Sequence, residues 1–411
     1  MDFLYASLRR FPDVEAPNLQ AWDATDELLV RRALAADFAG PEIAVIGDEY
    51  GAMTLGLTHA GHRGIRVHQD LATGRRALAR NARAVGVRPA EASQIPDEID
   101  QDRRVAARRA NARADRLGFG TDAVPFIECE LGPELLEGAR LVLLQLPKSL
   151  AELEEIADAV ARWAAPDVML IAGGRVKHMT LAQNEVLGRS FESVQPQRAE
   201  RKSRLIVATG PREAPETPPY PVTQAVDVPG LDRQLALVAH GGAFAGARLD
   251  IGTRVLLEVM AGRVEAPAST VVDLGCGTGA LAATYALAHP DARIIATDRS
   301  AAASDSALAT MRANGVDDRV AVMHDDAGSE IPDRTADLIL LNPPFHLGAS
   351  IHTGAASRLF DAAARILRPG GELLAVYNSS LGYKPELIRR IGPTEQLRRT
   401  PKFTVTRSIR H

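Results

Sequence analysis

The sequence predicts an α/β fold made of two similar Rossmann-like domains in tandem, and two observations support this prediction. In residues 223–411, short β-branched runs alternate with helical stretches rich in alanine and leucine. This alternation is typical of a parallel sheet with helices on both faces. In addition, four segments of the first half match four segments of the second half in the same order, which indicates an internal duplication.

The length of 411 residues also favours two domains, because single cores rarely grow to that size. Prolines gather in GPREAPETPPYPV (210–222), and this density of proline excludes a regular helix or a central strand. The predicted organisation is therefore a domain at 1–210, a proline-rich linker at 211–222 and a second domain at 223–411.

The second half gives the clearer series of elements. Its β-branched and apolar runs predict strands, and the longer stretches of alanine and leucine between them predict helices. The expected strands are 269–274, 292–298, 319–326, 336–344 and 371–378. The expected helices are 280–290, 301–315 and 356–367.

The first half repeats this plan with weaker punctuation. The matched pairs of segments are 42–53 with 270–281, 71–87 with 300–316, 141–149 with 338–346, and 166–177 with 369–380. An extra segment near 88–120 interrupts the repeat. It contains an arginine-rich stretch that predicts a helix, and the sequence assigns it no function.

Composition limits the class of protein. The chain is 46% hydrophobic and contains no apolar run near the ~20 residues that a membrane span needs. Its start lacks the organisation of a secretory signal, and two cysteines do not suit a disulfide-stapled fold, so we expect a cytoplasmic protein. The net charge of −4 means that any nucleic acid must bind at a local basic patch.

A glycine-rich turn, DLGCGTG (273–279), follows the first strand of the second half, and its small residues let a ligand lie against the backbone. Asp273 precedes the glycines at a place where a carboxylate attracts a cation and repels a pyrophosphate. The spacing also differs from the G-x-G-x-x-G of dinucleotide sites. We therefore expect S-adenosylmethionine, which is cationic and carries no phosphate, as the ligand. The residues expected to hold it here are Asp273, Gly275, Cys276, Gly277 and Gly279.

Carboxylates end the next two strands as well. Asp298 stands where it can accept hydrogen bonds from both ribose hydroxyls of the cofactor. Asp325 or Asp326 can accept one from the adenine amine, and the sequence favours Asp326 without deciding between them. Cys276 has no base nearby, so we expect it to pack rather than to act as a nucleophile.

The fourth strand ends in Asn-Pro-Pro-Phe, which predicts amine chemistry. An amine conjugated to a ring is a poor nucleophile, and hydrogen-bond acceptors can hold it in line with a methyl group. The side-chain oxygen of Asn342 and the carbonyl of Pro343 can accept its two hydrogens, while Pro343 and Pro344 shape the turn. Phe345 offers a face for the flat group that carries the amine. Asn342 also lies beside the expected cofactor.

With both halves in view, the chain resembles the two-domain ribosomal RNA guanine-N2 methyltransferases, and among these it is most similar to the large-subunit (23S) enzymes. Three segments that carry the resemblance are RRFPDVEAPNLQAWDATDELLV, LLQLPKSLAELE and MLIAGGRVKHMT in the first half. The second half adds GARLDIGTRVLLEVM, DLGCGTG, LNPPFH and PKFTV. The resemblance covers nearly the whole chain.

This resemblance implies two tandem class I methyltransferase domains, of which only the second is catalytic. The first copy is degenerate and serves RNA recognition and support: its GDEYGAM lacks the second and third glycines, and Lys148 stands where the second copy has Phe345. Asp250 and Gly252 match a family segment beside the cofactor. The implied reaction moves a methyl group from S-adenosylmethionine to guanine N2 in ribosomal RNA and leaves S-adenosylhomocysteine, with no metal and no obligate protein partner.

Other readings of the same residues stay open. Asn-Pro-Pro-aromatic also serves adenine N6 and protein glutamine amides, and the substrate could instead be a guanine of the small-subunit RNA. A different class is a non-catalytic RNA-binding or ribosome-assembly protein that keeps a cofactor pocket by descent. Such a protein would be expected to have lost Asp273, Asn342 or Phe345, and all three are present.

Overall fold

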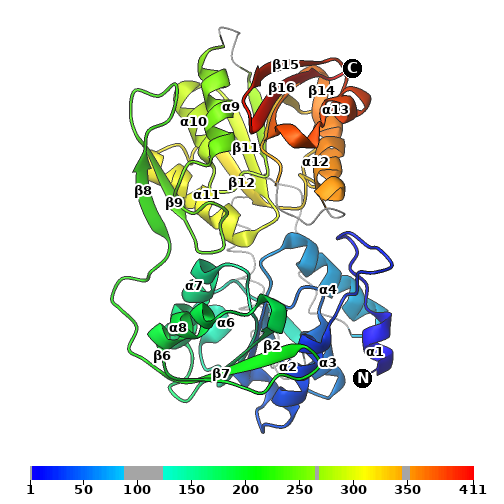
Figure 1. Cartoon of the computed structure of the whole chain (residues 1–411), viewed down its shortest axis with the longest axis vertical. Helices are drawn as coiled ribbons and strands as arrows, with labels where there is room; N and C mark the ends of the chain where they lie inside the picture. Colours follow the sequence, from blue (N-terminus) through cyan, green and yellow to red (C-terminus); the bar gives the residue numbers. More distant parts are fainter. Residues whose placement is uncertain (1, 88–123, 264–267, 345–351) are drawn as a thin grey trace. The chain divides into compact units, whose positions relative to one another are not determined.

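The computed structural model describes residues 2–87, 124–263, 268–344 and 352–411. The chain divides into two compact units, Met1–Pro219 and Tyr220–His411, and this division falls inside the proline-rich segment 211–222. Each unit holds a seven-stranded sheet with helices packed on it (Figure 1). In the described part of the chain, no helix is both long and apolar enough to cross a membrane.

The sheet of the C-terminal unit has the strand order β12-β11-β10-β13-β14-β16-β15. Its strands are β10 (Thr270–Leu274), β11 (Arg293–Asp298), β12 (Val320–His324), β13 (Ala336–Leu341), β14 (Leu367–Asn378), β15 (Thr394–Arg399) and β16 (Phe403–Ile409). Its helices are α9 (Ile251–Ala261), α10 (Ala280–Ala288), α11 (Ala301–Asn314), α12 (His352–Ile366) and α13 (Lys384–Arg390). A separate hairpin pairs β8 (Val222–Val226) with β9 (Leu235–Ala239).

Alternation along the central strands builds a core on each face of this sheet. Val271 of β10 packs with α9, α10 and α11, whereas its neighbour Val272 packs with α12 and α13. Leu340 and Leu341 of β13 divide between the two cores in the same way. Because successive side chains of a strand point to opposite faces, an unbroken apolar run is what a doubly covered sheet requires.

The N-terminal unit repeats this topology, with the strand order β3-β2-β1-β4-β5-β7-β6. Its strands are β1 (Ile43–Ile46), β2 (Ile65–His68), β3 (Phe126–Glu128), β4 (Leu141–Gln145), β5 (Met169–Arg175), β6 (Phe191–Pro196) and β7 (Ser203–Pro211). Its helices are α1 (Asp2–Ser7), α2 (Ala24–Leu34), α3 (Ala52–His59), α4 (Ala72–Ala84), α6 (Pro133–Leu136), α7 (Leu150–Trp163) and α8 (Leu181–Ser190). The arginine-rich stretch near 88–120 lies outside the described residues.

The predicted pair of Rossmann-like α/β domains is confirmed, with one difference in the sheets. Six strands of each sheet run in the same direction, but β16 lies antiparallel between β14 and β15, and β7 lies antiparallel between β5 and β6. A short turn at residues 400–402 joins β15 to β16, and two-stranded antiparallel pairs need only such a turn. The outer strand β15 is mostly exposed, so its sequence lacks the apolar run that marked the buried strands.

The first copy has kept one glycine that the sequence comparison counted as lost. Gly51 caps the N-terminus of α3 with φ +89°, and Gly279 caps α10 with φ +78°. The expectation that GDEYGAM lacks the third glycine was therefore wrong, because this left-handed turn between strand and helix is needed by the fold itself. The second glycine of the loop is replaced, since Glu49 stands where Gly277 stands in the other copy.

We expect Gly51→Ala to destabilise the N-terminal unit more than Gly86→Ala. Both glycines have positive φ, which costs an L-residue roughly 1 to 2 kcal/mol. A Cβ at Gly51 would also lie 2.6 Å from Leu78 Cδ1, whereas one at Gly86 would meet nothing within 4 Å. Overpacking adds about 1 to 3 kcal/mol. Both tryptophans, Trp22 and Trp163, lie in this unit, so denaturant unfolding followed by their fluorescence measures the effect; equal losses would contradict it.

Candidate active site

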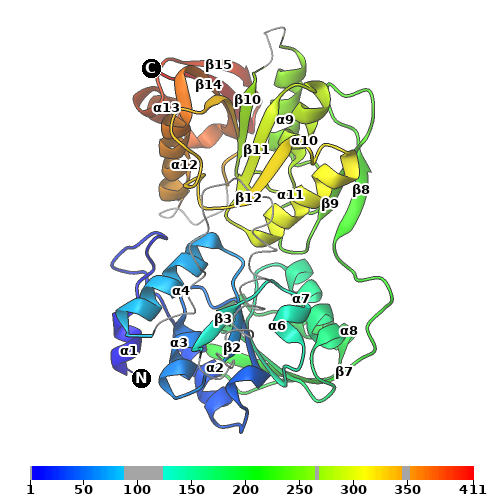
Figure 2. The ribbon, with the colours of Figure 1, turned by 180° about the vertical axis from the view of Figure 1, so that it is seen from behind.

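The candidate active site lies at the carboxyl edge of the sheet in the C-terminal unit. β10 is in the middle of the parallel strands, between β11 and β13, and Figure 2 shows β10, β11 and β12 side by side. The chain passes from β10 to β11 on one side and later returns to β13 on the other, so the strand order reverses at β10. Ligands of open α/β sheets bind beside such a reversal.

The glycine loop after β10 leaves open space along its backbone. Gly275 and Gly277 have φ +81° and +53°, and a Cβ added to either would meet nothing within 4 Å. Gly279 serves packing instead, because a Cβ there would lie 2.6 Å from Met311 Cε. The first two glycines thus form the kind of bare backbone cradle that suits a bound cofactor.

Asp273 lies beneath this loop rather than in it. Its carboxylate is 1% exposed, and Oδ2 accepts a hydrogen bond from Ala282 N (3.0 Å) in the first turn of α10. Oδ1 has no partner among the described residues. Burial raises the pKa of Asp273 to about 7, opposed by the Ala282 hydrogen bond and helped by the nearby charge of Asp298. Burial also raises the pKa of Cys276 well above its usual value, which suits a packing role.

Asp298 ties the end of β11 to the glycine loop. Its Oδ2 accepts from Gly277 N (2.9 Å) and its Oδ1 accepts from Ser300 N (3.0 Å) at the start of α11. Asp298 as a whole is half-buried, and both of its carboxylate oxygens accept hydrogen bonds from the backbone. The backbone of Gly275 is held as well, because its N–H donates to Thr297 O (2.8 Å).

The structure separates the two aspartates after β12. Asp325 is 1% exposed, and its carboxylate accepts from Asp326 N (2.8 Å), Ser329 Oγ (2.6 Å) and Glu330 N (2.8 Å). These bonds commit both oxygens of Asp325 to its own loop. Asp326 instead forms an ion pair with Arg358 of α12 through Oδ2. The two neighbouring carboxylates therefore have different partners: Asp325 bonds within its own loop, and Asp326 pairs with α12.

Asn342, at the end of β13, is held from α9. Its Nδ2 donates to Asp250 Oδ2 (2.9 Å) and to Thr253 Oγ1 (3.0 Å). Its Oδ1 is buried and has no hydrogen-bond partner among the described residues. Among the described residues, the site therefore contains an acceptor oxygen without a donor, and a buried polar atom of this kind calls for a partner.

The other residues predicted around Asn342 are placed in part. Pro343 is buried and Pro344 is exposed, whereas Phe345 lies outside the described residues. Asp250 caps the N-terminus of α9 by accepting from Gly252 N (2.8 Å) and Thr253 N (3.0 Å). A Cβ on Gly252 would lie 3.3 Å from Asn342 Oδ1 and 3.2 Å from Phe403, so glycine keeps this contact close.

Sequence reasoning missed two side chains of the site, Thr253 and Arg358. Thr253 is three residues after the cap Asp250, a spacing that places it in the first turn of α9 beside the cap. Arg358 is one of many arginines in the chain, and nothing in the sequence distinguishes it. In the described ranges, no group of three His, Cys, Asp or Glu side chains is arranged to hold a metal ion.

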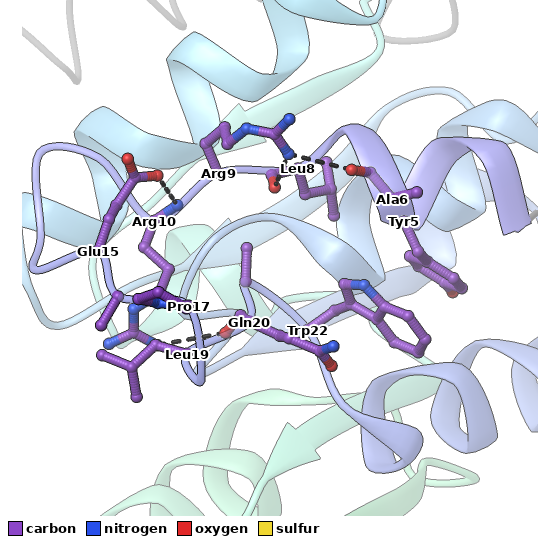
Figure 3. A pocket seen from close by; sticks show the side chains of 12 residues that line it. Tyr5, Ala6, Leu8, Arg9, Arg10, Glu15, Pro17, Leu19, Gln20 and Trp22 are labelled. Atoms are coloured by element: carbon purple, nitrogen blue, oxygen red, sulfur yellow. Dashed lines mark hydrogen bonds between the residues drawn. The ribbon is translucent and has the colours of Figure 1, made fainter.

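A separate hollow of about 560 Å³ lies in the N-terminal unit, lined by residues between Tyr5 and Trp22 (Figure 3). Its arginines bond to the neighbouring backbone: Arg9 donates to the carbonyls of Ala6 and Leu8, and Arg10 donates to Gln20 O. Tyr5 and Trp22 stack with ring centroids 4.9 Å apart. These contacts hold the segment together, and Arg9 N donates to Asn81 Oδ1 (3.0 Å), which ties the segment to α4.

Two family descriptions match the chain, one for each half. The family described as methyltransferase small domain matches residues 234–407. The family described as RLMG N-terminal domain matches residues 2–107 and 99–212. Among curated proteins, the ribosomal RNA large subunit methyltransferase G of Stutzerimonas stutzeri is 32% identical over 413 residues, covering 100% of this chain and 99% of that protein. The chain belongs to this methyltransferase family.

Further relatives and one solved structure agree with this membership. The proteins of the same name from Streptomyces avermitilis and Shewanella amazonensis are 32% and 30% identical, and each comparison covers 98% of this chain and at least 96% of the relative. A T. thermophilus 16S rRNA N2 methyltransferase, solved in complex with AdoMet and guanosine, covers 97% of both chains with a TM-score of 0.70. Because the two sequences are only 19% identical, this likeness shows that the present chain shares the two-domain fold of that structure and no more.

The first copy of the methyltransferase keeps a version of the Asn342 arrangement. Gln145, at the end of β4, occupies the matching position, and its Nε2 donates to Asp26 Oδ1 (3.1 Å). Gln145 Oε1 is also buried without a partner among the described residues. Lys148 is exposed where the other copy has Phe345. Duplication thus preserved the helix-to-strand contact while the residues around it changed.

We expect Asp273→Asn to stabilise the C-terminal unit at high pH. A carboxyl whose folded pKa is raised contributes stability below its unfolded pKa, and this is lost as pH rises through about 7. Asparagine keeps an acceptor for Ala282 N and does not ionise. The advantage of the variant in unfolding free energy should grow by roughly 2 to 3 kcal/mol between pH 5 and pH 8.

Denaturant unfolding followed by circular dichroism at the two pH values measures this difference. Asp291→Asn, at an exposed aspartate of the same unit, is the matched control and should show no such growth. An advantage for Asp273→Asn that is equal at pH 5 and pH 8 would contradict the assigned protonation.

Proposed function

We propose that this protein transfers a methyl group from S-adenosylmethionine to the exocyclic N2 amine of a guanine in large-subunit (23S) ribosomal RNA. The observation that carries the proposal is the buried oxygen of Asn342, which has no partner among the described residues and stands beside the glycine loop. A guanine amine supplies the hydrogen that this oxygen lacks. The large-subunit RNA is proposed as substrate because the similar proteins are named ribosomal RNA large subunit methyltransferase G.

In the proposed mechanism, Asn342 and Pro343 orient the amine. One N–H of guanine N2 donates to Asn342 Oδ1 and the other donates to the carbonyl of Pro343, so that the nitrogen lone pair is aimed along the transfer axis. When bound, S-adenosylmethionine supplies the electrophilic methyl group and leaves as S-adenosylhomocysteine. The nitrogen forms its bond to the methyl carbon as the sulfur–carbon bond breaks, and the proton then passes to solvent. Pro344 stiffens the turn, and Phe345 is proposed to stack on the base.

The cofactor is proposed to lie along the bare backbone of Gly275 and Gly277, where a Cβ would find open space. Asp298, at the end of β11, accepts from the ribose hydroxyls, and Asp326 accepts from the adenine amine. In its ionised form, the carboxylate of Asp273 favours the cationic end of the ligand. Gly252, beside Asn342, leaves room at the junction of cofactor and substrate.

The two domains are proposed to have different roles in the reaction. Residues 223–411 bind the cofactor and the target base, and residues 1–210 recognise and support the RNA. Extrusion of the guanine from its surroundings is required, because a stacked base cannot present its amine to the site. The proposed substrate is found in the cytoplasm, and the proposal needs neither a membrane nor an obligate protein partner.

The deciding experiment is methyl transfer from labelled S-adenosylmethionine to protein-free large- and small-subunit RNA from cells that lack this protein, with nucleoside mass analysis. N2-methylguanosine in the large-subunit RNA alone is the expected result. Label in small-subunit RNA, in adenosine or in protein would overturn the substrate but keep the chemistry. No label in any RNA or assembly intermediate would overturn the enzymatic function.

We expect Asn342→Ala to lower methyl transfer by at least about 100-fold, the loss seen when a group that orients and stabilises the transition state is removed. Asn342 Oδ1 is an acceptor for the substrate amine, so the affinity for S-adenosylmethionine should change little. Single-turnover rates and calorimetric binding measure the two effects. Retained turnover would contradict the mechanism, and a variant that loses the cofactor as well would point to a role in the cofactor site.

The two neighbouring aspartates should respond differently to removal. Asp326→Ala is expected to weaken binding of S-adenosylmethionine about tenfold, because a hydrogen bond to a charged group is worth roughly 1.5 to 3 kcal/mol. Asp325→Ala should lower the melting temperature instead, since Asp325 holds Ser329 and Glu330 in the loop. Calorimetric titration and thermal unfolding of both variants test this assignment, and the reverse pattern would exchange the two roles.

A further inference from the structure

The side-chain amide of Asn342 is fully engaged at its nitrogen end. An amide NH₂ group has two hydrogens, and here one is donated to Asp250 Oδ2 and the other to Thr253 Oγ1. Both acceptors belong to the first turn of α9, about ninety residues away in the sequence. The position of the Asn342 amide, just after β13, is therefore set by the N-terminal end of α9.

The identity of the two ends of this amide follows from Asp250. Its carboxylate already accepts from the backbone N–H groups of Gly252 and Thr253, so its position is fixed by the cap of α9. A carboxylate oxygen accepts hydrogen bonds, so the Asn342 atom that faces it must be the nitrogen. The oxygen Oδ1 is consequently the end of the amide that α9 does not bond: a Cβ on Gly252 would lie 3.3 Å from it, and it is buried without a hydrogen-bond partner among the described residues.

The orientation matters because an amide rotated by half a turn would present the wrong group. In that state the NH₂ group of Asn342 would face the amine of the substrate, and two donors cannot bond to each other. The terminal torsion of asparagine is broad and roughly two-fold, so packing alone does not select one orientation. Hydrogen bonds from the neighbouring helix have to select it.

We propose that Thr253 is a positioning residue for methyl transfer, whose hydroxyl accepts the second amide hydrogen of Asn342 and holds Oδ1 toward the substrate amine. This inference rests on the proposed function, because it names how the acceptor of that reaction is oriented. Asp250 shares the task but also caps α9, so its removal would disturb the helix as well. The hydroxyl of Thr253 bonds to Asn342, whereas the side-chain cap of α9 comes from Asp250. Replacing this hydroxyl therefore tests the orientation of Asn342 without removing the cap.

The inactive copy supplies an independent comparison. Asp23 caps α2 as Asp250 caps α9, and in both helices the residue three positions later contacts the amide on the neighbouring strand: Asp26 bonds to Gln145, and Thr253 bonds to Asn342. Among the described residues of the first copy, that hydrogen bond alone holds the amide nitrogen, whereas in the second copy the capping residue Asp250 also bonds to it. The hydrogen bond between the helix and the side-chain amide is thus present in both copies. The amide nitrogen is held by more hydrogen bonds in the second copy, whose site is intact.

The test compares Thr253→Val, which keeps the shape and removes the hydroxyl, with Thr253→Ser, which keeps the hydroxyl. Thr58→Val is the matched control, because Thr58 is a buried threonine of the other unit whose hydroxyl donates to Thr54 O (2.8 Å). For each variant, kcat and KM on the RNA, the Kd for S-adenosylmethionine and the melting temperature are measured.

Thr253→Val is expected to lower kcat about tenfold, the consequence of leaving a buried N–H group without its acceptor. The Kd for S-adenosylmethionine should stay near the wild-type value, the melting temperature should fall no further in Thr253→Val than in Thr58→Val, and Thr253→Ser should keep kcat to within about threefold. Unchanged kcat in Thr253→Val overturns the proposal. An equal loss in both variants, or a loss that follows the melting temperature, overturns it in favour of a structural role.

A second readout does not depend on activity. In nitrogen-15 spectra, the side-chain NH₂ signals of Asn342, assigned by their absence in Asn342→Ala, should exchange slowly with solvent in the wild type and at least about tenfold faster in Thr253→Val. If wild-type protein fails to methylate RNA, the proposed function fails, but slow exchange still supports the anchored amide. Equal exchange rates in the two proteins would overturn the anchoring by Thr253.

Discussion

Parallel strands place all their carboxyl ends at one edge, and the whole candidate site depends on this constraint. β10, β11, β12 and β13 carry the glycine loop, Asp298, Asp326 and Asn342 in turn, although these residues are spread over about seventy positions. The central strands are buried on both faces, which makes the frame rigid and keeps their ends in register. The reaction at this edge therefore depends on a few residues in the loops after the strands, and the buried strands themselves can stay unchanged.

The sequence was informative where a local pattern has a physical cause. Unbroken apolar runs predicted the buried strands, and the glycine loop and Asn342 were expected at strand ends, where the structure has them. It was less informative where a contact joins distant segments. Thr253 and Asn342 are 89 positions apart, and the choice between Asp325 and Asp326 depended on which carboxylate its own loop already uses. The strand β15 lies at an edge of the sheet and is mostly exposed, so its sequence lacks the apolar pattern of a buried strand.

The two copies show which parts of such a site belong to the fold and which belong to the ligand. Gly51 and Gly279 have both been kept, since the left-handed turn and the close packing behind it are needed in either case. Gly277, which has open space beside it, corresponds to Glu49 in the first copy. An amide held by the adjacent helix is present in both. Under the proposed function, in which only the second copy binds a cofactor, the glycine of the cradle is free to change in the first copy, whereas the residues that support the loop are kept.

The antiparallel edge strands also affect how the molecules behave toward one another. An unpaired strand edge can recruit the edge of another molecule and begin a shared sheet. β15 carries Glu395, Arg398 and Arg399 on an exposed surface, and Arg398 forms an ion pair with Glu258 (2.7 Å). β6 ends at Pro196, which has no N–H group to donate. The charges on β15, at an edge of the C-terminal sheet, and the proline in β6, at an edge of the N-terminal sheet, both oppose strand addition. These two outer strands therefore help to protect the protein from edge-to-edge aggregation.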